Sequence, residues 1–195
     1  MFQRGLNSLA RRQSAHNQRL CNLFLNSQRY KTILAAIDGT TYGYLALEES
    51  FNISNSGDEI IGYHIPLDSY QFAYEHLVFQ PGIPLSESQQ NEYEQKKQQF
   101  IDEIEQSVSG IQSQSAKKDV KFRFVVGADS IAIKQDLVDA VDEFNADTLV
   151  LGCKGTTHSL KEKLTKTVID ILGSVPDYCV HNAKCSVYVV KPKED

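Results

Sequence analysis

The chain has 195 residues, of which 41% are apolar and 23% charged, a composition that suits one globular core with appendages. No stretch approaches the roughly 20 uninterrupted apolar residues of a membrane span, and no short apolar segment with a small-residue cleavage site opens the sequence. We therefore expect a protein that is neither membrane-spanning nor secreted, and place it in the cytoplasm.

Charge divides the chain into two parts. Residues 1–37 contain six Lys and Arg and no acidic residue, whereas the remainder contains 14 Lys and Arg against 25 Asp and Glu. The acidic remainder argues against nucleic acid as its partner. The four cysteines form no C-x-x-C pair and have no spacing typical of a zinc site, so we expect free thiols and no metal.

Residues 1–29 form a separate basic arm, and residues 30–195 form the domain. The apolar residues of the arm fall near one side at helical spacing, which predicts an amphipathic helix. They are Phe2, Leu6, Leu9, Leu20, Leu23 and Phe24. We expect a retained arm that docks on a partner protein. The alternatives are a mitochondrial targeting segment, which has the same Arg-rich, acid-free composition, and a segment that folds back onto its own domain.

Strand and helix signals alternate after the arm. Short apolar runs predict strands over 32–37, 59–65, 120–126, 147–151 and 186–190. Helices are expected over 42–51, 91–108, 130–144 and 168–181, and residues 67–90 are expected to form a long irregular connection. In the helix over 91–108, the expected buried stripe consists of Phe100, Ile101, Ile104 and Val108.

This alternation predicts an α/β, doubly wound, Rossmann-like fold with a five-stranded parallel sheet in the order 3-2-1-4-5. Ligands of such sheets bind beyond the carboxyl ends of the strands, where the strand order reverses, and helix N-termini there favour anionic groups. The loops after the first and fourth strands are therefore the candidate site.

Two common nucleotide motifs are absent. The loop after the first strand reads Asp38-Gly39-Thr40-Thr41-Tyr42-Gly43, which is no G-x-G-x-x-G fingerprint, and G-x-x-x-x-G-K-[ST] occurs nowhere. The sequence also offers no nucleophile with its base and no carboxylate pair on a shared face. We expect that the protein is not an enzyme.

Three stretches resemble the universal stress protein family: ILAAIDGT, VVGADSIAIKQDLVDAVDEFNADTLVLGCKG and LGSVPDYCVHNAKCSVYVVKP. The resemblance covers residues 30–192. It implies a site for ATP, with Mg²⁺ brought by the nucleotide, in which Asp38 holds the adenine or ribose edge and Gly127 lies beside the nucleotide. Asp38 as a cap of the following helix is the alternative.

The resemblance also implies a phosphate cradle. The family pattern is Gly-x-x-Gly, nine residues, then Gly-Ser or Gly-Thr; here Gly152, Lys154 and Gly155 form the first part and Gly173-Ser174 the second. Seventeen residues separate Gly155 from Gly173, eight more than the pattern has. Glycines that serve only close packing are the alternative.

Two functions follow from these expectations. The first is an ATP-binding module that regulates or mediates protein association. The second is a non-catalytic structural or interaction subunit of a larger assembly, with a degenerate nucleotide site. Partners are expected at the arm and at the last strand, residues 186–190, which in this family commonly pairs with a second copy to form a homodimer.

Overall fold

The computed structural model describes residues 30–69, 84–115, 119–153 and 173–192. The chain divides into two units, Met1–Tyr30 and Lys31–Asp195, and the account below concerns the second. The predicted basic arm lies outside the described residues. Within the described ranges, no helix is both long enough and apolar enough to cross a membrane.

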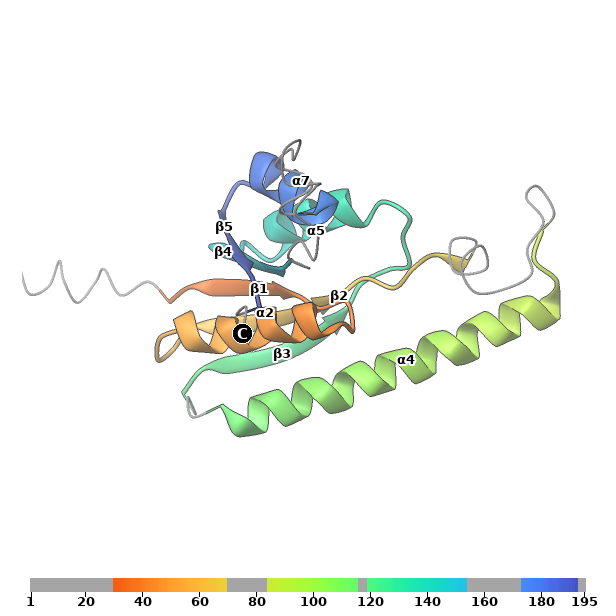
Figure 1. Ribbon diagram of the computed structural model, residues 1–195, viewed down its shortest axis with the longest axis horizontal. Coiled ribbons are helices and arrows are strands. Elements are labelled where there is room, and N and C mark those ends of the chain that lie inside the picture. Colours follow the sequence, from red (N-terminus) through yellow and green to blue (C-terminus); the bar gives the residue numbers. More distant parts are fainter. Residues whose placement is uncertain (1–29, 70–83, 116–118, 154–172, 193–195) are drawn as a thin grey trace, which may run out of the picture. The chain divides into compact units, whose positions relative to one another are not determined.

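The sheet has five parallel strands in the order β3-β2-β1-β4-β5 (Figure 1). The strands are β1 (Thr32–Ala36), β2 (Glu59–His64), β3 (Lys121–Val126), β4 (Thr148–Gly152) and β5 (Ser186–Val190). The helices are α2 (Thr41–Ile53), α4 (Glu87–Gln114), α5 (Ile133–Glu143) and α7 (Ser174–Asn182). The predicted fold class and strand order are confirmed.

Helices cover both faces of the sheet, because alternate residues of each strand point to opposite sides. Leu34 of β1 packs in the cluster that contains α5 and α7. Its neighbours Ile33 and Ala35 pack in the cluster that contains α2 and α4. Figure 1 shows this division, with α5 and α7 on one side of the sheet and α2 and α4 on the other.

The start of α4 was predicted wrongly. The expected irregular connection ran to residue 90, but α4 begins at Glu87, because Ser86 and Gln89 form a capping box. The Ser86 hydroxyl accepts from the Gln89 amide at 3.3 Å, and the Gln89 side chain accepts from the Ser86 amide at 2.9 Å. The helix also continues past residue 108 to Gln114.

The last two helices begin later than predicted. Ser130 does not belong to α5, because it forms a parallel bridge with Leu67 and therefore extends the β2–β3 pairing. Gly173 interrupts the helix expected over 168–181: its φ of 84° lies in the left-handed region, which glycine adopts without strain. The helix α7 starts at the next residue, and residues 168–172 lie outside the described part.

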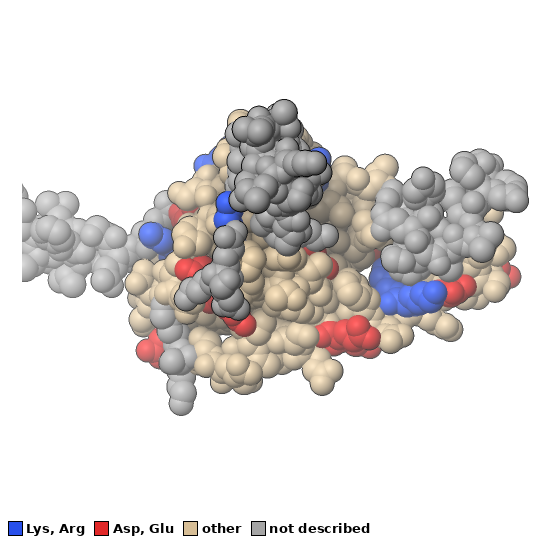
Figure 2. All heavy atoms as spheres, in the orientation of Figure 1, with Lys and Arg blue, Asp and Glu red and all other residues tan. Residues whose placement is uncertain are grey.

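Strands β3 and β5 are the two edges of the sheet. On β5 the side chain of Tyr188 is 44% exposed, and its hydroxyl lies 3.3 Å from a carboxylate oxygen of Glu49 on α2. On the face drawn in Figure 2, charged side chains stand in small groups, and basic groups adjoin acidic ones. On α4, Lys96 pairs with Glu92 and Lys97 with Glu94, at 2.8 Å each.

Candidate functional site

A cavity of about 780 Å³ lies at the carboxyl ends of the strands. The ends of β1 and β4 contribute Asp38 and Gly152, and the end of β2 contributes His64. The order of the sheet reverses between β1 and β4, so this is the place where parallel α/β sheets bind ligands. The remaining walls come from α4 on one side and from α5 and α7 on the other.

Asp38 is exposed and organises the loop that leads into α2. Its Oδ1 accepts from the Thr40 amide at 3.0 Å and from the Thr40 hydroxyl at 2.7 Å. Thr40 in turn is the N-cap of α2, and its side chain accepts from the amide of Gly43. Asp38 therefore supports the helix cap indirectly, through Thr40, while its carboxylate also borders the cavity.

Two of the predicted site glycines have a packing reason to lack a side chain. A methyl group at Gly152 would collide with the backbone carbonyl of Tyr42, in the first turn of α2. At Gly127 it would lie 2.5 Å from the hydroxyl oxygen of Tyr63. Gly152 lines the cavity, whereas Gly127 packs beneath Tyr63, which does line it.

The predicted phosphate cradle is described only in part. Lys154 and Gly155 lie outside the described residues. Gly173 is the N-cap of α7, and Ser174 is its first residue. Both are exposed, and the next turn of the helix borders the cavity through Val175 and Pro176. The N-terminus of α7 therefore lies at the cavity, as the predicted role of Gly173-Ser174 requires.

His64 is a buried imidazole in the wall of the cavity. Its Nδ1 lies 2.7 Å from the carbonyl oxygen of Ile37, which can only accept, so Nδ1 carries the proton of the neutral ring. Burial lowers the pKa of His64 and outweighs the opposing effects of the Ile37 carbonyl and the Asp38 charge. The neutral ring therefore presents Nε2 as an acceptor.

The helix α4 supplies cavity residues that the sequence did not reveal. Phe100 was expected in the buried stripe with Ile101, Ile104 and Val108; these three are buried, but Phe100 is 42% exposed. Its ring touches Gly39, which at φ 76° turns the chain after β1, and lies edge-on to His64 with ring centres 5.7 Å apart. The sequence signal for this face was the spacing by four, three and four residues of Tyr93, Lys97, Phe100 and Ile104, which places all four side chains on one side of α4.

Metal ligands and reactive thiols are not evident in the described part of the chain. No group of three His, Cys, Asp or Glu side chains there could hold a metal ion.

Burial raises the pKa of Cys179 to about 11, and burial also raises the pKa of Cys185. Cys153 is buried and free. Thiols that keep their protons at neutral pH are poor nucleophiles.

Comparison with known proteins identifies the family. The model of the universal stress protein family matches residues 29–191, most of the chain. The chain belongs to the universal stress protein family. The resemblance inferred from the sequence is thereby confirmed, and the family match covers every described strand and helix.

Individual relatives are distant. A Staphylococcus aureus (strain USA300) protein assigned to the universal stress proteins is 25% identical over 166 residues, which are 85% of this chain and 86% of the relative. Universal stress protein UspA from Lactobacillus plantarum has a similar structure, with a TM-score of 0.53 and 19% identity over 84% of this chain and 99% of the other. A family member from Arabidopsis thaliana, solved with AMP bound, gives a TM-score of 0.51 and 16% identity over 85% of this chain and 94% of the other. These structures share the fold.

Replacement of Gly152 by Ala tests the packing role of this glycine. We expect the free energy of unfolding to fall by about 1–3 kcal/mol, because the new methyl group forces α2 away from β4. Gly110→Ala in α4 is the matched control, since nothing surrounds its site, and it should stabilise by about 0.5–1 kcal/mol. Urea denaturation measures both. Equal effects in the two variants would contradict the packing role.

Acidification should weaken the fold through His64. The unfolded chain protonates this ring near its ordinary pKa of 6.5, and the folded chain only at lower pH. Stability is therefore fully present above pH 6.5 and falls as the pH drops from 6.5 toward the folded pKa. His64→Asn should reduce the loss of stability between pH 7 and 5 in denaturation experiments.

Proposed function

We propose that this protein is a nucleotide-binding module of the universal stress protein family, with an adenine nucleotide bound in the cavity at the carboxyl ends of β1, β2 and β4. The observation that carries the proposal is the position of that cavity at the reversal of strand order, with Asp38, His64 and Gly152 in its walls. The AMP bound to the Arabidopsis thaliana family member supports the same ligand class.

The described residues suit the base and the ribose. The cavity volume of about 780 Å³ falls in the range of small-molecule sites, and most of its lining is apolar or aromatic, with a few polar groups. The Asp38 carboxylate is an acceptor for ribose hydroxyls, and Nε2 of His64 is an acceptor for an amino group. A nucleoside such as adenosine offers both donors, the ribose hydroxyls and the amino group of the base.

The phosphates would point toward α7. The backbone amides at a helix N-terminus favour anions, and Gly173-Ser174 begins this helix beside the cavity. ATP with Mg²⁺ is the form that we propose, with the metal held by the phosphates, because the described residues offer no ligand set of their own. Lys154 and Gly155 would complete the cradle.

The proposed role of the bound nucleotide is regulatory. The described cavity brings together no nucleophile with a general base, so we assign the site to binding, with the bound state tuning association with other proteins. The N-terminal arm and the edge strand β5 are the proposed contact regions for a partner or a second copy of the chain. An edge strand with an exposed aromatic side chain, Tyr188, favours association.

A second candidate function is a non-catalytic interaction subunit that retains the fold without a working site. The packing reasons for Gly127 and Gly152 favour it, because both glycines would be needed without any ligand. The two functions differ in one measurable property, the binding of a nucleotide by the intact chain.

Binding of AMP and of ATP with Mg²⁺ by the whole protein tests the first function. Isothermal titration calorimetry should give one site per chain. Asp38→Ala should weaken binding about tenfold, or about 1.4 kcal/mol, through loss of a charged hydrogen-bond acceptor. Asp102→Ala is the control, since this exposed carboxylate lies on α4 and pairs with Gln98. An unmodified, folded chain that binds neither nucleotide supports the interaction subunit instead.

Deletion of residues 1–29 tests the arm. We expect circular dichroism and thermal melting of the truncated chain to match those of the full chain, because the five strands and their helices all lie after residue 29. Native mass spectrometry should show fewer co-purifying subunits. An unfolded truncated chain would make the arm part of the core. Unchanged association would show that the arm is not an anchor.

A further inference from the structure

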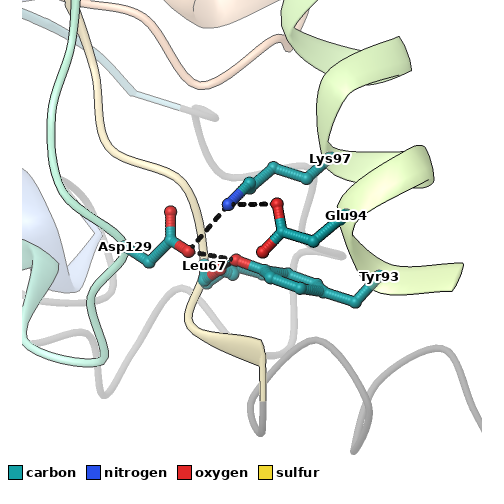
Figure 3. Close-up of polar contacts among 5 residues, drawn as sticks. All are labelled: Leu67, Tyr93, Glu94, Lys97 and Asp129. Atoms are coloured by element: carbon teal, nitrogen blue, oxygen red, sulfur yellow. Dashed lines mark hydrogen bonds and ion pairs between the residues drawn. The ribbon is translucent and has the colours of Figure 1, made fainter. Parts of the chain in front are cut away.

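The helix α4 is fixed over the cavity by a polar cluster at its N-terminal end, formed by Tyr93, Glu94, Lys97 and Asp129 with the carbonyl of Leu67 (Figure 3). The hydroxyl of Tyr93 lies 2.6 Å from Oδ2 of Asp129 and 2.8 Å from the oxygen of Leu67, and it shares its single proton between them. Lys97 Nζ lies 3.0 Å from the same Asp129 oxygen and 2.8 Å from Glu94. Three separate segments meet here.

The base of this cluster is held by backbone hydrogen bonds. Leu67 follows β2 and Asp129 follows β3, and the two loops continue the pairing of these strands. The Gly127 amide donates to the backbone carbonyl oxygen of His64 at 2.7 Å, and the Ser130 amide donates to that of Pro66 at 3.0 Å. The Leu67 carbonyl and the Asp129 carboxylate, which accept from the Tyr93 hydroxyl, are therefore fixed relative to the sheet. Their contacts with Tyr93 set the position of α4.

Tyr93 and Lys97 keep their protons near neutral pH. Burial and the hydrogen bond to Asp129 raise the pKa of Tyr93 well above its ordinary value, so the phenol remains a donor. Partial burial lowers the pKa of Lys97, but its hydrogen bonds to Glu94 and Asp129 outweigh this, and the net direction is upward. Lys97 also lies 4.9 Å from the centre of the Tyr93 ring, a cation–π contact.

The position of α4 determines where Phe100 lies. Phe100 lies seven positions after Tyr93, about two turns of helix, so both side chains leave α4 on nearly the same side. The tip of the Phe100 ring touches Gly39, beside Asp38, the ring lies edge-on to His64, and its remaining exposed surface borders the cavity. A large apolar side chain left 42% exposed inside a ligand-sized cavity has a free aromatic surface.

We propose that Phe100 is the stacking residue for the planar base of the nucleotide and that Tyr93, through its contacts with Asp129 and Leu67, is the positioning residue that holds it there. This proposal rests on the proposed nucleotide-binding function. It assigns base recognition to α4, in addition to the loop after β1. Because every base has an aromatic face, stacking gives affinity for planar rings, while Asp38 and His64 supply the hydrogen bonds that orient them.

The test uses the full chain with AMP and with the 5′-monophosphate of 2-aminopurine riboside, whose fluorescence is quenched when the base stacks on an aromatic ring. Phe100→Leu keeps apolar bulk and removes the ring, so AMP affinity should fall about tenfold and the quenching should be lost. Gln98→Ala, an exposed change on the same helix, is the control and should alter neither.

Tyr93→Phe removes only the hydroxyl. If Tyr93 acts through Phe100, this change should weaken AMP binding several-fold in the natural chain and have little further effect in the Phe100→Leu chain. Additive losses would show that Tyr93 acts independently of Phe100 and would overturn its positioning role. Thermal melting of each variant separates a change in binding from a loss of folding.

The outcomes distinguish the two proposals. Failure of the unmodified chain to bind either AMP or ATP with Mg²⁺ overturns the proposed function, and this inference with it. Binding by the unmodified chain that Phe100→Leu leaves unchanged overturns the stacking role alone. Loss of affinity and quenching in Phe100→Leu, with both retained in Gln98→Ala, supports it.

Discussion

The direct contact between the first turn of α2 and the ends of β1 and β4 is the constraint on which the carboxyl edge of this protein depends. At Gly152 and Gly43 there is no room for a side chain between helix and strand, since a methyl group would meet Tyr42 or Asp38. This close approach places the α2 N-terminus, its Thr40 cap and the Asp38 carboxylate together. The packing of α2 against β1 and β4 therefore forms the cavity wall at β1.

The opposite wall depends on polar contacts more than on apolar packing. The C-terminal half of α4 is anchored by Ile104 and Val108, which are buried against the sheet. Its N-terminal half reaches the loops after β2 and β3 through Tyr93, Lys97 and Asp129. Hydrogen bonds have directional requirements that apolar contacts lack. The polar contacts therefore restrict sliding of α4 along the cavity, and the apolar contacts hold the helix against the sheet.

The glycines show why a family pattern and a binding role must be separated. Gly127 and Gly152 occur where the nucleotide-binding pattern places them, and both also have a packing partner, Tyr63 or Tyr42. A glycine at such a position is required by the fold whether or not phosphate is bound. Evidence for a ligand must therefore come from binding measurements and not from these glycines.

The sequence by itself determined the parallel sheet, its order and the family, because short apolar runs that alternate with helices leave few right-handed topologies. It also identified the loops that border the cavity, through Asp38 and Gly152. Only the tertiary structure decided that Phe100 leaves the buried stripe, that Tyr93 meets Asp129, and that α5 begins at Ile133. These depend on pairings between residues that are far apart in the chain, and helical or strand periodicity reports which face a residue occupies, but not which segment lies opposite.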